Sequence, residues 1–177
     1  MAITRLNNNS ASSITTLSGV TSIPNLASLP SGLGGKVLQV VQGNTSTQVN
    51  NTSASYAGIG LSASITPSST SSKILVNASV SHVGLTGGDI YVVCFLGIFR
   101  DSTNIQEWNA NRVRSGAGGS NHESGASCSL SYLDSPSSTS SITYSIQQRL
   151  EISGSSRTSA SQYNNRWSTI QLLEIGA

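Results

Sequence analysis

Few side chains in this sequence can carry out acid–base, nucleophilic or metal chemistry. The 177 residues include two histidines, two cysteines and seven acidic residues. His82 and His122 lie far apart, and neither has a second ligand at the spacing of a metal site. No Gly-x-Ser-x-Gly elbow and no phosphate-binding glycine loop is present. We therefore predict a protein that is not an enzyme, with no catalytic residues, no metal and no cofactor.

The two cysteines do not form a disulfide framework. Cys94 lies inside the apolar run 91–96, a setting that predicts a buried free thiol. A disulfide between Cys94 and Cys128 stays open as an alternative, because a sequence alone does not give the distance between two thiols.

The composition indicates strands and turns. Serine and threonine number 37 and 15, and only 9% of residues are charged, against about 25% in typical soluble domains. The net charge of +2 and the 36% of apolar residues oppose intrinsic disorder. Dispersed arginines predict no nucleic-acid binding. The longest apolar run, around residues 90–99, is too short to insert in a membrane, and no signal peptide is visible, so we expect synthesis in a cytoplasm.

Residues 1–35 differ from the rest of the chain and form a separate predicted unit. Their apolar positions recur every third residue, at Ile14, Leu17, Val20, Ile23, Leu26 and Leu29. This period fits an extended chain of polyproline II type, whose single apolar stripe needs copies of itself or a groove on a partner. The alternative is a flexible serine-rich tail with a chance spacing.

Residues 36–177 have the pattern of one β domain. Alternating apolar positions predict strands at 37–42, 56–65, 73–83, 89–100, 103–108, 126–133, 141–152 and 167–175. The segments 44–55 and 154–165 are predicted as loops. Eight antiparallel strands are typical of a jelly roll or a similar sandwich. An apolar terminal strand at 167–175 is expected in the middle of a sheet, because chain ends fray unless a sheet holds them.

The strand at 89–100 is apolar on both faces, so both of its faces must be covered. A lone sandwich leaves one face of each sheet in water. We therefore predict a subunit interface at Ile90, Val92 and Phe95.

Several segments occur in the same order as in a known group of proteins. They are 35–42, 61–67, 72–76, 99–105, 132–136, 142–144 and 168–175, preceded by the opening residues 1–10. With them the chain resembles the knob domains of fibre and decoration proteins of tailed phages, especially marine and freshwater ones such as cyanophages. The resemblance implies an all-β antiparallel jelly-roll sandwich of the tumour-necrosis-factor and complement-C1q type, a homotrimer, and attachment to other virion proteins by the N-terminal arm.

Two functions follow from this resemblance, with a third held as an alternative. The first is a short trimeric tail fibre or tail-tip protein, assembled in the bacterial cytoplasm and resident in the virion. Its knob would bind a host-surface glycan through Trp108, Asn109, Asn111 and Tyr163. The second is a capsid decoration or head-fibre protein clamped to the head by residues 1–35. The third is a polysaccharide depolymerase.

Overall fold

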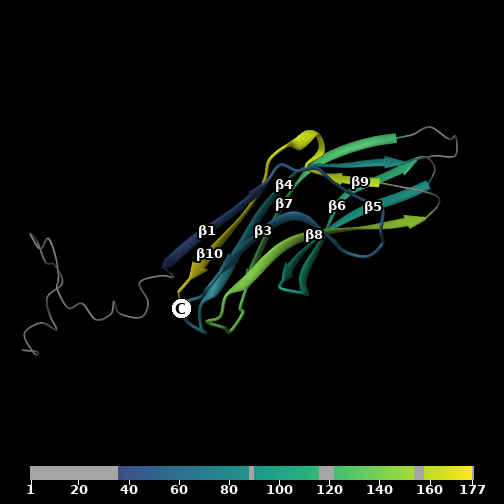
Figure 1. Ribbon diagram of the computed structural model, residues 1–177. Coiled ribbons are helices and arrows are strands. Elements are labelled where there is room, and N and C mark those ends of the chain that lie inside the picture. The colour runs from purple at the N-terminus through teal and green to yellow at the C-terminus, as the bar shows by residue number, and fades with distance from the viewer. Residues whose placement is uncertain (1–35, 88–89, 116–121, 154–157, 177) are drawn as a thin grey trace, which may run out of the picture. The chain divides into compact units, whose positions relative to one another are not determined.

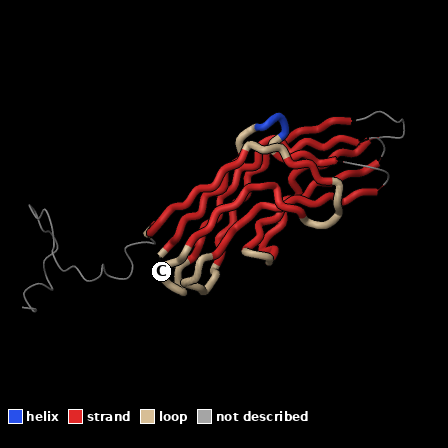
Figure 2. Tube along the Cα trace, viewed as in Figure 1, coloured by secondary structure: helices blue, strands red, loops and turns tan. Residues whose placement is uncertain are grey.

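The structure is a computed structural model that describes residues 36–87, 90–115, 122–153 and 158–176. Nearly all of these residues lie in strands, and no helix among them is long and apolar enough to cross a membrane. Figure 2 shows the strands in red, with one short helical turn in blue. The elements are β1 (Val37–Thr45), β2 (Val49–Asn51), β3 (Ala57–Ile65), β4 (Lys73–Gly87), β5 (Ile90–Arg100), β6 (Thr103–Ser115), β7 (His122–Asp134), β8 (Ile142–Ser153), β9 (Thr158–Ser161), η2 (Tyr163–Asn165) and β10 (Ser168–Ile175).

The strands form two antiparallel sheets that pack as a sandwich (Figure 1). One sheet has the order β1-β10-β4-β9-β2, and β7 pairs with the other edge of β4. The second sheet has the order β3-β8-β5-β6. The terminal strand β10 lies between β1 and β4, which confirms the central position expected for it. The all-β antiparallel sandwich predicted from the sequence is therefore the observed fold.

The core consists of the inward side of each alternating strand. The buried residues alternate along β3, β4 and β8, as the apolar pattern predicts. They are Ile59, Leu61, Ala63 and Ile65 of β3, Ile74, Val76, Ala78 and Val80 of β4, and the even-numbered residues 142–150 of β8. The inward residues of β10 are Ser168, Ile170, Leu172 and Glu174, all fully or almost fully buried. Alternation of apolar and polar residues predicts the buried face of β3, β4 and β8 correctly, because one face of each strand is dry and the other is wet.

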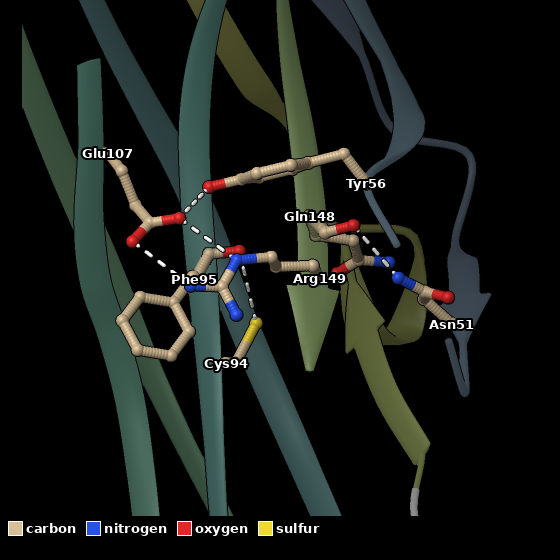
Figure 3. A network of polar contacts seen from close by, with 7 residues as sticks. All are labelled: Asn51, Tyr56, Cys94, Phe95, Glu107, Gln148 and Arg149. Carbon is tan, nitrogen blue, oxygen red and sulfur yellow. Dashed lines mark hydrogen bonds and ion pairs between the residues drawn. The ribbon is translucent and has the colours of Figure 1, made fainter. Parts of the chain in front are cut away.

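The two segments predicted as loops each contain a short strand, β2 and β9, and these strands pair with each other. A buried amide network holds them against β8. Gln148 Nε2 donates to the Val49 carbonyl at 3.3 Å, and Gln148 Oε1 accepts from Ser159 Oγ at 3.2 Å and Ser161 Oγ at 2.8 Å. Asn51 Nδ2 donates to the Gln148 carbonyl at 2.9 Å (Figure 3). Polar side chains take the place of an apolar stripe here, so apolar periodicity could not detect these strands.

The strand β1 continues past Gly43, where the sequence pattern ended it, and at Gly43 it passes close to the backbone of β3. A Cβ atom at this position would lie 2.0 Å from the backbone oxygen of Ser62 in β3. Only a residue without a side chain fits, because the obstacle is backbone and cannot rotate away.

We expect Gly43→Ala to lower the free energy of unfolding by about 3 kcal/mol, since it forces β1 away from β3. Urea denaturation followed by circular dichroism measures this loss. Gly58→Ala is the matched control, because a Cβ at Gly58 has no atom within 4 Å. Equal midpoints for the two variants would refute the steric argument.

Candidate functional site

The six apolar positions of the predicted arm, Ile14, Leu17, Val20, Ile23, Leu26 and Leu29, lie outside the described residues. Their role in attachment stays a prediction.

Both faces of β5 are covered, as the sequence predicted. Val92, Cys94, Leu96 and Ile98 point into the core between the sheets, where Val92 is only 4% exposed. On the opposite face, Val93 and Phe99 are also buried.

Part of the cover on this second face comes from the same chain. The ring of Tyr56 meets Phe99 edge-on, with 4.9 Å between ring centroids. The guanidinium carbon of Arg149 lies 4.1 Å from the centroid of Phe95 (Figure 3). The absence of a side chain at Gly97 leaves room for the two rings, since a Cβ there would lie 3.1 Å from both Tyr56 and Phe99.

Hydrogen bonds fix this cover in place. Arg149 Nε and one terminal nitrogen donate to the two carboxylate oxygens of Glu107 at 2.9 and 3.1 Å, and the Tyr56 hydroxyl donates to the same carboxylate. The paired arginine lowers the pKa of Glu107, and the carboxylate in turn raises the pKa of Arg149. Burial, followed by the bond to Glu107, raises the pKa of Tyr56. All three groups keep their charge states at neutral pH, so this is a fixed cover and not a titrating site.

The exposed apolar surface of β5 available for the predicted subunit interface is therefore smaller than the sequence suggested. Val92 is buried in the core of its own chain, and Phe95 is half-buried under Arg149. The side chain of Ile90 is not among those described. Contact of these residues with another subunit stays a prediction, and it now depends mainly on Phe95.

The four residues proposed to bind a glycan do not form one cluster. Trp108 is half-buried and packs against the core. Asn111 Nδ2 donates to the Val83 carbonyl at 2.9 Å, so this amide ties β6 to β4. Asn109 is exposed on β6, whereas Tyr163 belongs to η2, which follows β9 of the other sheet. Glycan binding by these residues stays a prediction, with Asn109 the one exposed member.

The segments that carry the resemblance to phage knobs, scattered along the sequence, meet at one end of the sandwich. This end, which we call the base, contains the start of β1, the end of β3, the start of β4, the β5–β6 turn, the end of β7, the start of β8 and the end of β10. Pairing brings them together: Val37 is opposite Ile175, Ile74 is opposite Asp134, and Ile65 is opposite Ile142.

A buried carboxylate at the base joins β10 to β1 and to the loop between β3 and β4. Glu174 of β10 is 0% exposed and lies beneath Gln39 of β1 and Ser68 of the β3–β4 loop. It accepts from the Ser68 amide at 2.7 Å, the Ser68 hydroxyl at 2.6 Å and Gln39 Nε2 at 2.7 Å. Hydrogen bonds from Ser68, and further ones including that from Gln39, lower the pKa of Glu174 from 4.5 to about 2. None of these three donors carries a charge.

A second carboxylate joins the two sheets at the base. Asp134, at the end of β7, is 7% exposed and accepts two 3.0 Å hydrogen bonds from one terminal nitrogen of Arg100 in β5. The buried hydroxyl of Tyr144 in β8 donates to the same carboxylate at 2.6 Å. Burial, followed by the bond to Asp134, raises the pKa of Tyr144. Both buried carboxylates at the base therefore have structural partners inside the chain.

The outer face of β1, β10, β4 and β7 bears an apolar row at the base. Val40 is opposite Leu173, Leu173 is opposite Leu75, and Leu75 is opposite Leu133. Direct cross-strand partners share a face, so these four side chains cross the sheet in one line. Val40 is 58% exposed and Leu133 48% exposed. Each of the four lies in one of the segments that carry the resemblance.

Two polar rows follow the apolar one along the same face. The first is Gln42, Gln171, Asn77 and Ser131, and the second is Asn44, Thr169, Ser79 and Ser129. Small side chains here leave a shallow hollow of about 460 Å³ lined by residues of β4, β7 and β10. Alternation within a strand predicts which of its side chains face the core, but it does not predict this row, because a row across a sheet depends on the register between distant strands.

Cys94 and Cys128 are both free thiols, and burial raises the pKa of Cys94 to about 12, so it is an inert core residue.

No protein-family model matches the chain, and no curated protein matches it. Among solved structures, the crystal structure of the infectious bursal disease virus VP2 subviral particle is similar at 13% identity and a TM-score of 0.36, covering 78% of this chain and 38% of that chain. The structure of the Gx strain of the same virus is similar at 11% identity and a TM-score of 0.35, covering 77% of this chain and 38% of that chain. This chain thus spans less than half the length of those chains, and TM-scores this low establish no shared function.

Proposed function

We propose that this chain is a structural protein of a bacteriophage virion, a short trimeric tail fibre or tail-tip protein held to the particle by residues 1–35. The observation that supports it best is the base. The seven segments that resemble phage knobs are separate in sequence, yet they build one end of the sandwich, and β1 at this end follows the arm directly in sequence.

The chemistry of the described residues favours a scaffold over a catalyst. The buried acids Glu174 and Asp134 are committed to hydrogen bonds that join strands. The partly exposed acid Glu107 is paired with Arg149. A capsid decoration or head-fibre protein is the alternative function, since the arm could clamp a head as well as a tail. A polysaccharide depolymerase is the remaining alternative.

Imaging of intact particles with a labelled antibody against the sandwich tests the proposal. Label at the tail would support the tail-fibre function, and label over the head would replace it with the decoration function. Particles free of label would refute both. Incubation of purified protein with host polysaccharide tests the depolymerase alternative, which a release of reducing ends would establish.

Deletion of residues 1–30 should abolish incorporation into particles and leave the sandwich folded, because every described strand begins after residue 36. Immunoblotting of purified particles measures incorporation, and circular dichroism of the isolated protein measures folding. Replacement of Leu17, Val20 and Ile23 by serine in the full chain is a milder variant that keeps the arm length. Normal incorporation of the deleted protein would contradict the role of the arm.

A further inference from the structure

The apolar row Val40–Leu173–Leu75–Leu133 is a surface that the described chain leaves uncovered. Next to it, Val37 and Leu38 at the start of β1 are 52% and 47% exposed. The outer face of the other sheet differs, because Tyr56 and Arg149 shield the aromatic residues of β5 there. Contiguous exposed apolar side chains on one face usually mark an interaction surface.

We propose that a second copy of this chain covers the row, so that the homotrimer proposed above closes through the outer face of β1, β10, β4 and β7 and not through β5. This inference rests on the proposed function for the existence of a trimer. It adds the surface by which the copies meet.

The chemistry of the face suits contact with itself. The apolar row and the two polar rows behind it contain no charged side chain, so copies apposed on these three rows bury no like charges. The exposed Lys73, opposite Ile175, lies at the base edge of the same face, where its charge can stay in water. Within the row, Gln171 Nε2 donates to Gln42 Oε1 and Asn77 Oδ1 accepts from Ser131 Oγ. The remaining donors and acceptors of these amides can pair with polar groups of a neighbouring copy. The hollow between small side chains gives space for side chains of the neighbour.

The position of the row also suits the arm. Val37 and Leu38 adjoin the row and follow residues 1–35 in the chain. Copies that meet at the row would therefore start their arms close together. An arm with one apolar stripe at every third residue can bury that stripe by association with identical arms about a common axis. One interface thus serves both halves of the chain.

Light scattering after size-exclusion chromatography of the full chain at micromolar concentration tests the proposal. We expect a trimer for the natural chain and a folded monomer for Leu133→Asp and for Val40→Asp. Each substitution should raise the dissociation constant of the trimer at least 100-fold. Ser62→Asp is the matched control, because Ser62 is exposed on β3 of the other sheet, and it should remain trimeric. Leu133→Gln adds no charge and should weaken the trimer less. It tests the same contact if the aspartate variant does not fold.

Three other results would overturn the inference, and each points elsewhere. Trimers that survive Leu133→Asp and Val40→Asp but dissociate with Phe95→Asp would place the interface on β5 and leave the proposed function intact. A monomeric natural chain would remove the trimer itself. A monomeric natural chain whose incorporation into particles is lost with Leu133→Asp would assign the row to a different virion protein.

Discussion

Glu174→Gln should lower the free energy of unfolding at pH 7 by about 2 kcal/mol, although it changes the side chain by one atom. The carboxylate accepts three hydrogen bonds from Ser68 and Gln39 and has no exposed surface. The amide nitrogen of glutamine would face a donor, which leaves buried polar groups unpaired, at a cost of about 1–3 kcal/mol. Urea denaturation followed by circular dichroism gives the value directly. The matched control is Glu151→Gln, because Glu151 is an exposed acid of β8.

The same variant should also change the response to acid. The pKa of Glu174 is depressed from 4.5 to about 2 in the folded chain, so its contribution is fully present above pH 4.5. That contribution is lost as the pH falls from 4.5 towards 2, because the unfolded chain then binds the proton more readily. The stability gap between the natural chain and Glu174→Gln should therefore narrow over this range. A constant gap from pH 7 to pH 3 would show that the carboxylate charge is not what stabilises the base.

Asp134→Ala should cost about 3 kcal/mol, because it leaves the buried hydroxyl of Tyr144 and the guanidinium of Arg100 without their acceptor. The side chain of Arg100 is 31% exposed, so water replaces part of its lost bond and the cost stays below that of a fully buried pair. Thermal unfolding of the purified sandwich measures the effect.

A double-mutant cycle separates the two partners of Asp134. Tyr144→Phe removes only the hydroxyl and should cost about 1 kcal/mol in the natural chain and much less in Asp134→Ala. Arg100→Gln should behave in the same way. Strictly additive losses would show that Asp134 does not connect the sheets through these groups.

The strand faces could be predicted from the sequence because each depends on neighbouring residues alone. Ile59, Leu61 and Ile65 alternate with glycine and serine, and this pattern fixes which side is dry. The same local signal failed for β2 and β9, where the buried side chains of Asn51 and Ser159 form hydrogen bonds with Gln148 and belong to no apolar stripe.

The candidate surfaces could not be predicted, because they depend on which distant residues become neighbours. Because β5 is apolar on both faces, the sequence correctly predicts that both faces are covered. No local pattern shows that Tyr56 and Arg149 cover part of the outer face. Likewise, Val40, Leu75 and Leu133 each look like an isolated apolar residue on a wet face. Only the observed strand order aligns them with Leu173.

The central place of β10 has a kinetic consequence. Gln171 of this strand bonds to Gln42, 129 residues away in the chain, so the sheet that bears the row closes only after the largest loop has closed. Until then β10 presents an unpaired edge to solvent beside exposed leucines, and this combination promotes aggregation of partly folded chains. Because the first and last strands of the sandwich pair in one sheet, we expect folding to be slow and its yield to fall as the protein concentration rises.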